Sequence, residues 1–313
     1  MGLLFITDPP EELKAYKDTT VAMMRAAQAR GQQAWICAQT ALHWTKNRVA
    51  ASATRISLTD DDEDWYRTHE SATRALPDYD AVLMRKDPPF DMEYVASTWL
   101  LEEAERKGAR VFNSPRAIRD HNEKFAIAEF PQFTVPSLVA RSMEHLQAFA
   151  DEHKKVVFKR LDGMGGAGIF VVRHDDPNRN VIVETVSDGG TRSVMAQRFI
   201  PEIAQGDKRV ILIDGEVVPH CLARIPKPGE SRGNLAAGAR GEAQAVTPRH
   251  REIAAAIGPA LAARGLLFVG LDVIGDWLTE LNVTSPTGFR EIRDQTGFDV
   301  AGTFVEALLS KLS

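Results

Sequence analysis

Short apolar runs alternate with longer amphipathic stretches over roughly the first 110 residues of the chain. The apolar runs are residues 3–7, 33–38, 81–85 and 110–112, and the helical stretches between them are residues 18–31 and 93–108. Asp18 or Thr19 can cap the first helix, and Gly31 and Gly108 can end the two helices. Strand–helix–strand repeats of this kind predict a mostly parallel sheet with helices on its faces.

The pattern changes in the middle of the chain. Ser114 followed by Pro115 is typical of a helix start, and we expect a domain boundary near residues 113–122. After Pro136, apolar runs follow one another with tight turns between them, which predicts an antiparallel, α+β arrangement after the N-terminal α/β domain. These runs are residues 155–161, 168–172, 193–200, 208–215 and 216–225. The three parts that we expect are residues 1–122, 123–200 and 201–313.

Two polar segments interrupt this pattern. Residues 226–244 are rich in glycine and charge and precede a helix at 248–264, so we expect a mobile surface loop, centred on 227–241. The acidic run from Thr59 to Trp65 predicts a solvated loop or a helix start. A calcium site is disfavoured there because the run lacks alternating ligands and a closing glutamate.

The composition excludes several classes of protein. The 313 residues carry a net charge of −5, whereas nucleic-acid binding normally requires a basic surface. No apolar run approaches the roughly 20 residues that cross a bilayer, and the first apolar run ends at Asp8, too early for a signal peptide. Cys37 and Cys221 lie far apart, so we expect neither a disulfide nor a structural zinc site. We therefore predict a cytoplasmic protein that binds neither nucleic acid nor membrane.

A glycine-rich string, DGMGGAG, occupies residues 162–168. Gly163, Gly165 and Gly168 have the spacing of a dinucleotide-binding turn, but that turn requires a helix directly afterwards, and IFVVRHD predicts a strand. The string also lacks the Gly-Lys-Ser/Thr ending of a Walker A loop. Two interpretations remain: a β-hairpin whose backbone N–H groups cover a polyphosphate, and a flexible hairpin tip.

Basic residues near the glycine string provide local positive charge. Lys159 ends the strand before it, where its ammonium group either contacts a phosphate under the loop or is simply solvated. Arginine is suited to clamp phosphate because its guanidinium group forms paired hydrogen bonds. Further candidates for a phosphate clamp are Lys208, Arg209, Arg224, Arg232 and Arg240.

Acidic and amide side chains occur on a predicted hairpin between Phe268 and Pro286. Glu280 and Asn282 are two residues apart on one strand and therefore face the same side. Asp272 joins them only if the hairpin has an odd-length loop or an equivalent bulge, because a plain two-residue turn would place it opposite Thr279. We predict that loop or bulge. Oxygen ligands of this kind suit magnesium, and the alternative is an exposed polar sheet face.

The order of these features resembles the ATP-grasp superfamily, and within it the bacterial glutathione synthetases. The resemblance rests on Lys124, Lys159, DGMGGAG, MAQRFIP, DKRV, LARIP, RGNLAAG, GLDVIG and TELNVTSPT, and on MRKDPPFD and VFNSPRAIRDHNEK in the N-terminal part. ATP-grasp features are shared by many ligases, whereas MRKDPPF and RGNLAAGARGE are particular to this one family. The resemblance covers nearly the whole chain and implies an ATP-grasp fold preceded by a parallel-sheet domain, with the glycine-rich string in residues 123–200 and the metal site in 201–313.

The resemblance also implies roles for individual residues. The nucleotide-binding residues would be Lys124, Lys159, Gly163, Gly165, Gly166, Gly168, Gln197, Phe199, Ile200, Asp207 and Lys208. The metal ligands would be Asp272, Glu280 and Asn282, and the basic groups around the transferred phosphate would be Arg209, Arg224 and Arg232. The residues that hold the other substrate would be Arg85, Lys86, Ser285, Pro286 and Thr287.

The implied reaction joins γ-glutamylcysteine to glycine at the expense of ATP, through an acyl phosphate, with Mg²⁺ or in its place Mn²⁺. Residues 227–241 would close over the intermediate. The resemblance further implies a homo-oligomer, commonly a tetramer. The alternatives are another ATP-grasp ligase, such as a D-alanine ligase or an amino-acid ligase, and a nucleotide-binding protein without turnover, which would have lost the metal ligands. A nicotinamide dehydrogenase is disfavoured by the strand that follows Gly168.

Overall fold

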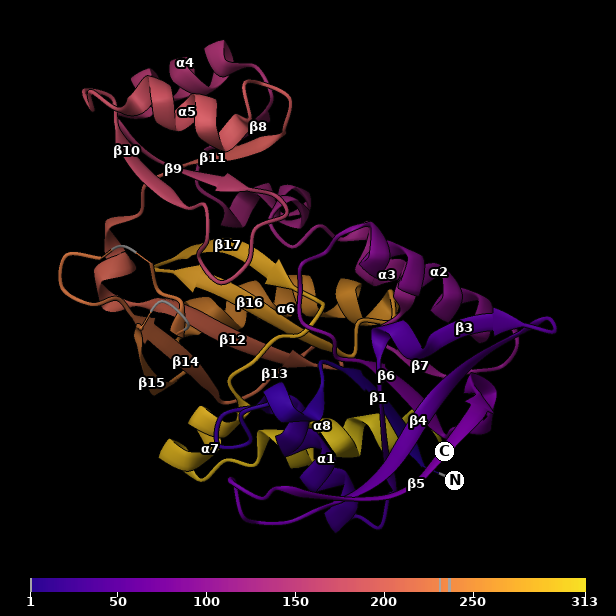
Figure 1. Ribbon diagram of the computed structural model, residues 1–313. Coiled ribbons are helices and arrows are strands. Elements are labelled where there is room, and N and C mark those ends of the chain that lie inside the picture. Colours follow the sequence, from indigo (N-terminus) through magenta and orange to yellow (C-terminus); the bar gives the residue numbers. More distant parts are fainter. Residues whose placement is uncertain (1, 231, 236–237) are drawn as a thin grey trace.

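The computed structural model describes residues 2–230, 232–235 and 238–313, which form three β-sheets with helices on their faces (Figure 1). The N-terminal sheet carries the predicted parallel core, in the order β2 (Ala34–Ala38), β1 (Leu3–Thr7), β6 (Ala81–Met84) and β7 (Val111–Phe112). Helices α1 (Thr19–Ala29) and α2 (Met92–Arg106) connect these strands, as predicted. Asp18 is the cap of α1, because its carboxylate accepts a hydrogen bond from the Val21 N–H.

An antiparallel extension of this sheet was not predicted. Strands β3 (Leu42–Thr45), β4 (Arg48–Leu58) and β5 (Tyr66–Ala75) follow β2, and β4 pairs antiparallel with β2, β3 and β5. The expectation of a mostly parallel sheet therefore holds only for the half built by β2, β1, β6 and β7. The reason is the polar, largely exposed sequence of β5, YRTHESATRA, which gives no apolar run to mark a strand.

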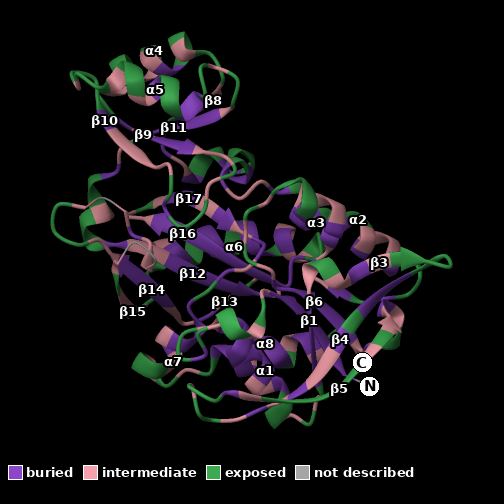
Figure 2. Ribbon diagram, viewed as in Figure 1, coloured by how far each residue is buried: buried purple, intermediate pink, exposed green. Residues whose placement is uncertain are grey.

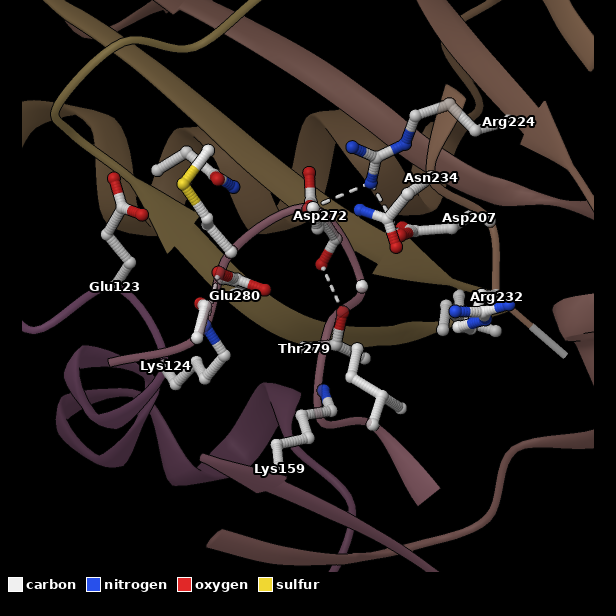
Figure 3. Close-up of a pocket in the computed structure, with 18 of the residues that line it drawn as sticks. Glu123, Lys124, Lys159, Asp207, Arg224, Arg232, Asn234, Asp272, Thr279 and Glu280 are labelled. Atoms are coloured by element: carbon white, nitrogen blue, oxygen red, sulfur yellow. Dashed lines mark hydrogen bonds and ion pairs between the residues drawn. The ribbon is translucent and has the colours of Figure 1, made fainter. Parts of the chain in front are cut away.

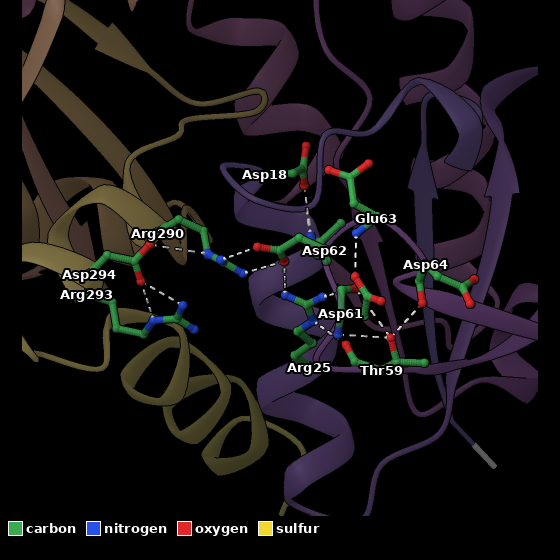
Figure 4. A network of polar contacts seen from close by, with 11 residues as sticks. Asp18, Arg25, Thr59, Asp61, Asp62, Glu63, Asp64, Arg290, Arg293 and Asp294 are labelled. Atoms are coloured by element: carbon green, nitrogen blue, oxygen red, sulfur yellow. Dashed lines mark hydrogen bonds and ion pairs between the residues drawn. The ribbon is translucent and has the colours of Figure 1, made fainter.

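The loop between β4 and β5 is the acidic run that begins at Thr59, and it contains no helix start. It is also more than a solvated loop. Asp62 accepts a hydrogen bond from Arg25 of α1 at 2.7 Å and another from Arg290 at 2.9 Å, so its carboxylate joins two helices (Figure 4). Arg290 belongs to α7 (Phe289–Thr296), far away in the sequence, and is buried.

The second sheet is antiparallel, in the order β10 (Phe170–Arg173), β9 (Lys155–Arg160), β11 (Val194–Arg198) and β8 (Ser137–Ala140). The connection after β10, which was predicted as a tight turn, is instead the helix α5 (Arg179–Ser187), and a second helix that was not predicted, α4 (Met143–His153), precedes β9. Both pack against this sheet, and their apolar side chains share one core with it. This layer stands apart from the rest of the molecule (Figure 1).

The third sheet is antiparallel in the order β15 (Arg240–Ala245), β14 (His220–Ile225), β12 (Asp207–Ile213), β16 (Phe268–Ile274) and β17 (Trp277–Asn282), with β13 (Glu216–Val217) beside β12. The predicted end of the mobile loop at 227–241 was wrong, because Arg240 and Gly241 belong to strand β15. The sequence RGEAQA has no apolar run, but its backbone pairs with β14 throughout. Helix α6 (Pro248–Ala263) confirms the helix predicted at 248–264, and it covers one face of this sheet.

The opposite face of the third sheet meets the N-terminal domain. Side chains of β1, α1, β12 and β16 form one buried core with α7 and with α8 (Val300–Ser310), the last helix (Figure 2). Helix α3 (Pro115–Asp120) starts at Ser114, whose side chain makes no cap hydrogen bond. The 3₁₀ turns are Pro10–Glu12, Gln39–Ala41, Leu76–Asp78, Phe125–Glu129, Pro131–Phe133 and Pro201–Gln205.

Candidate active site

A cavity of about 310 Å³ lies between the second and third sheets, and most of the predicted site residues line it (Figure 3). It occupies the face of the third sheet that points away from α6. Residues with odd numbers on β12, such as Arg209, face the cavity side, whereas Val210 and Leu212 pack toward α6. The predicted residues that line the cavity are Lys124, Lys159, Gly163, Gly165, Gly166, Gln197, Phe199, Ile200, Asp207, Arg209, Arg224, Arg232, Asp272, Glu280, Asn282, Ser285 and Thr287.

Two predicted nucleotide residues do not line the cavity. Lys208 lies between Asp207 and Arg209 on β12, so strand alternation turns it toward the other face, where its ammonium group donates to Gln205 O at 2.6 Å and to Gln244 Oε1 at 2.9 Å. Gly168 returns the chain into β10 with a φ of +70°, and a Cβ at this position would contact only Arg160.

Three predicted substrate residues also lie outside the cavity lining. The buried Arg85 donates to Thr20 Oγ1 at 3.1 Å and to the Pro286 carbonyl oxygen at 2.9 Å, so it joins the N-terminal domain to the segment after β17. Lys86 forms an ion pair with Asp8 at 2.7 Å. The side chains of Arg85 and Lys86 therefore contact other protein groups and are not part of the cavity lining.

The hairpin of β16 and β17 has the predicted register. Asp272 is paired directly with Glu280, and the shift that allows this pairing is a bulge between Asp272 and Val273, while Ile274 pairs with Trp277 across a two-residue turn. Of the two devices predicted, the structure uses the bulge. Thr279 occupies the bulge, and its hydroxyl group donates to the Asp272 carbonyl oxygen at 3.1 Å.

Three buried charged side chains and the partly buried Asp207 meet beside this hairpin. Arg209 donates to both carboxylate oxygens of Asp272, at 2.6 and 3.2 Å, and Arg224 donates to Asp272 at 2.8 Å and to Asp207. Burial favours the neutral acid, but the two guanidinium groups outweigh burial and hold the pKa of Asp272 below its ordinary value. Burial raises the pKa of Asp207 to about 6, and the nearby charge of Asp272 adds to this effect.

The two lysines lie under the glycine-rich loop. Lys124 donates to the Gly163 carbonyl oxygen at 2.6 Å and forms an ion pair with Glu280 at 3.3 Å, which ties the loop to the acidic hairpin. Lys159 is buried, and this burial lowers its pKa. A desolvated ammonium group without a close carboxylate is a strong binding group for an anion such as phosphate.

The glycine-rich loop and the segment at 232–235 meet over the cavity. A Cβ at Gly166 would lie 2.5 Å from Oδ1 of Asn234, and Gly166 has a φ of +82°. Gly233 is equally confined, because a Cβ there would lie 2.9 Å from the Arg224 carbonyl oxygen and from Cβ of Asp207. The absence of a side chain at Gly166 therefore lets the two loops approach each other closely, and that at Gly233 lets its segment lie against Arg224 and Asp207.

Sequence reasoning did not single out Glu123 or Asn234, although both stand in quoted motifs. Glu123 lines the cavity, and one of its oxygens, Oε1, accepts hydrogen bonds from the Val283 N–H, the Thr284 N–H and the Thr284 hydroxyl group at 2.8 to 3.1 Å. Burial raises the pKa of Glu123. Glu123 stands directly before the predicted nucleotide-binding residue Lys124, but the pattern of apolar residues gives no reason to select it as a site residue.

The acidic hairpin can hold a divalent cation. Asn282 donates its amide N–H to the Gly270 carbonyl oxygen at 3.2 Å, which leaves its Oδ1 as a ligand atom next to Glu280. The carboxylate oxygens of Asp272 retain lone pairs beyond those used by the arginines. Among residues 2–230, 232–235 and 238–313, no group of three or more His, Cys, Asp or Glu is placed to bind a metal, so the amide of Asn282 is essential to this candidate site.

Comparison with known families gives two matches along the chain. The model of the prokaryotic glutathione synthetase N-terminal domain matches residues 1–119, and that of the prokaryotic glutathione synthetase ATP-grasp domain matches residues 123–297. Among curated proteins, the glutathione synthetase of Ralstonia nicotianae is 58% identical over 98% of this chain and 95% of its own. That of Nitrosomonas europaea is 55% identical, covering 98% and 97%, and that of Pseudomonas aeruginosa is 48% identical, covering 98% and 97%.

Solved structures share the fold at lower identity. D-cycloserine synthetase DcsG is 16% identical with a TM-score of 0.70 over the full length of both chains. The ATP-grasp ligase PsnB, in complex with its precursor peptide and AMPPNP, is 19% identical with a TM-score of 0.63, covering 99% of this chain and 98% of its own. None of the helices in the described part of the chain combines the length and apolar character that a membrane crossing requires.

Proposed function

The chain belongs to the prokaryotic glutathione synthetase family, and from this we propose that its central cavity holds ATP, γ-glutamylcysteine and glycine side by side. The enzyme is an ATP-dependent carbon–nitrogen ligase of glutathione synthesis with an ATP-grasp fold. One observation supports the proposed site most strongly: the bulge on the β16–β17 hairpin pairs Asp272 with Glu280 directly beneath the glycine-rich loop.

The nucleotide would lie between the two sheets. Lys124 and Lys159 would contact its phosphates, with N–H groups of residues 163–166 above them, and Gln197, Phe199 and Ile200 would line the adenine pocket. The Phe199 N–H already donates to the Lys155 carbonyl oxygen at 3.0 Å, so adenine would have to use other backbone groups of this segment. We propose that Asp207 accepts from a ribose hydroxyl group. Its Oδ1 has no hydrogen-bond partner among the described residues but is fully enclosed, so the side chains around it would have to shift when the nucleotide binds.

The family requires a divalent metal, which would be held here by Asp272, Glu280 and Asn282. We propose that this metal is Mg²⁺, with Mn²⁺ as a substitute. The metal would neutralise phosphate charge and align the γ-phosphate for transfer. Binding it would weaken the pairing of Asp272 with the two arginines. Arg209 and Arg224 would then be available for the phosphate oxygens.

The reaction that we propose has two steps, neither of which needs a protein nucleophile. The cysteinyl carboxylate attacks the γ-phosphorus of ATP, which releases ADP and gives an acyl phosphate. The amine of glycine then attacks the acyl carbon, the phosphate leaves, and the amine loses a proton. Arg209 and Arg224 would stabilise the charge that develops on the transferred phosphate, and Arg232, in the segment before β15, would help to exclude water.

Ser285 and Thr287 remain the candidates for direct contact with γ-glutamylcysteine, since both line the cavity. Arg85 would act on this substrate indirectly, because it holds the Pro286 carbonyl oxygen. We also propose a cytoplasmic homo-oligomer, and a division into an N-terminal domain at 1–122 and two ATP-grasp subdomains at 123–200 and 201–313. The two buried, free cysteines fit a reducing compartment.

Product analysis tests this function. ADP formation should require both ATP and γ-glutamylcysteine, and added glycine should convert the acyl phosphate into glutathione with one ADP per peptide bond. Dipeptides with a D-alanine acceptor and peptide C-termini serve as alternative substrates. ADP release that responds to one of these, and not to γ-glutamylcysteine, would reject the substrate assignment.

A further inference from the structure

Among the described residues, one partly buried carboxylate of the cavity has no positively charged partner. Glu123 lies at one end of the cavity, far from Arg232 (Figure 3). All three hydrogen bonds that its side chain accepts end on Oε1, and no described residue donates to Oε2. Oε2 is not fully enclosed either, so it keeps some exposed surface, and Glu123 lines the cavity.

The neighbouring cation, Lys124, forms its contacts with other residues. Lys124 follows Glu123 in the chain, but its ammonium group donates to the Gly163 carbonyl oxygen and to Glu280. Asp87 lines the same cavity and adds negative charge. A partly buried carboxylate without a counterion is costly, and a ligand that brings a positive charge relieves this cost.

The three hydrogen bonds to Oε1 hold the carboxylate in place and so determine where the ligand would lie. The donors, Val283 and Thr284, directly follow the metal-ligand candidate Asn282 and precede Ser285. Glu123 is therefore held rigidly between the metal site and the substrate segment, close enough to Glu280 for the charge of Glu280 to act on it. A rigid carboxylate next to the reacting centre is suited to orient a nucleophile.

Resting on the proposed function, we infer that Oε2 of Glu123 binds the ammonium group of the incoming amine substrate, glycine. Two substrates carry an ammonium group, glycine and γ-glutamylcysteine. In the dipeptide this group lies at the far end from the reacting carboxylate, whereas the amine of glycine has to reach the acyl carbon itself. The position of Glu123 beside the metal site favours glycine.

The test compares wild type with Glu123→Gln, an isosteric change that removes the charge and keeps an oxygen for the three donors. KM for glycine should rise at least tenfold, while KM for ATP, KM for γ-glutamylcysteine and Tm stay nearly constant. A rise in KM for the dipeptide alone, a changed metal requirement, parallel losses for all substrates with a lower Tm, or no change at all would each overturn the inference. If E123Q does not fold, Glu123→Asp, which withdraws the carboxylate, should give the same glycine-specific rise.

Hydroxylamine separates this inference from the proposed function. It is largely uncharged at neutral pH, and its nitrogen attacks the acyl phosphate, releases phosphate and gives a hydroxamate. Wild type and E123Q should form hydroxamate at the same rate from ATP and γ-glutamylcysteine. No hydroxamate from wild type would reject the acyl-phosphate function itself. Hydroxamate formation that is lost in E123Q together with glycine turnover would reject the ammonium site and leave the function intact.

Discussion

At the scale of single residues, Gly166 lies so close to Asn234, where the two loops meet over the cavity, that a Cβ would lie 2.5 Å from its Oδ1. This close approach joins the second sheet to the third through a position where only a hydrogen atom fits. Glycine is needed there twice over, for the positive φ and for the space. Neighbouring Gly165 also has a positive φ, +61°, but a Cβ at that position would meet nothing within 4 Å.

These two glycines give a matched pair of variants. Gly166→Ala and Gly165→Ala both add backbone strain of roughly 1–2 kcal/mol in the left-handed region. Only G166A also forces the two loops apart. We expect kcat/KM for ATP to fall about tenfold further in G166A than in G165A, measured by steady-state ADP release.

A double variant checks the cause. Asn234→Ala removes the atoms that a Cβ at Gly166 would strike, so N234A should recover most of the extra loss in G166A. If the two losses simply add, the contact between the loops does not limit ATP binding.

Glu105 on α2 gives a prediction about pH. Burial raises its pKa to about 7, and the charge of Glu102 adds to this. Because the folded state holds this proton more tightly than the unfolded chain, stability falls as pH rises from the ordinary pKa of a glutamate to about 7. Glu105→Gln should be about 1 kcal/mol more stable than wild type at pH 8, a value discounted for the partial exposure of the side chain. Urea unfolding at pH 8 and pH 5 measures this, and an equal difference at both pH values would contradict it.

The sequence predicted the position of a residue correctly where strand geometry allowed only one arrangement. Asp272 could join Glu280 only through an odd loop or a bulge, and the bulge is present. Prediction failed where the tertiary fold decides which way a side chain points. Lys208 looked equivalent to Arg209, but strand alternation puts them on opposite faces, and Arg85 is used between domains. Glu123 carried no pattern at all.

At the scale of elements, the loop between β4 and β5 fastens α7 to α1. Asp62 bonds to Arg25 and to the buried Arg290, and α7 begins directly after the cavity-lining segment that ends at Thr287 (Figure 4). Thr19 of α1 strengthens the same junction, since its hydroxyl oxygen accepts from the Gly288 N–H at 3.1 Å.

Asp62→Asn should therefore leave the Arg290 guanidinium group buried without its main partner. We expect a loss of about 2 kcal/mol in the free energy of unfolding, below the range for a fully buried pair because Asp62 is 28% exposed. Asp64→Asn in the same loop is the control. Among the described residues the carboxylate of Asp64 pairs only with Arg67, at the surface, so this variant should change stability by less than about 0.5 kcal/mol. Chemical denaturation measures both, and equal losses would contradict the role of Asp62.

Helices and strands could be predicted from the sequence where their burial requires a run or periodic pattern of apolar residues. The strands β1, β2, β6, β9, β12 and β16 are buried and apolar, and each was found from its apolar run. Strands β5 and β15 were missed because their stability comes from backbone pairing with a neighbour, which leaves the side chains polar. The helices α4 and α5 are short and amphipathic, and the strands around them dominated the pattern.

At the scale of the whole molecule, α8 closes the core between the N-terminal sheet and the third sheet. Phe304 is 2% exposed, and its ring lies 5.8 Å from that of Phe268 and 6.3 Å from that of Phe289. This helix lies beyond residue 297, where the match to the ATP-grasp domain model ends, yet it packs against α1.

Phe304→Ala should cost about 3–4 kcal/mol, because it leaves a cavity at the junction of three aromatic rings. Glu306→Ala on the same helix removes an exposed ion pair with Arg30 and should cost less than about 0.5 kcal/mol. Thermal unfolding of both variants gives the comparison. A small loss in F304A would mean that the domains hold together without α8.

The packing of α8 against β1 has a consequence for biosynthesis. The apolar face that α1 and β1 present to α8 stays uncovered until the ribosome has made almost all of the described chain, because the residues that cover it lie so far along the sequence. Contacts of such long sequence separation form slowly and leave nascent chains prone to aggregation. Slower translation should therefore prolong the exposure of this surface and increase the need for chaperones that shield apolar surface during synthesis.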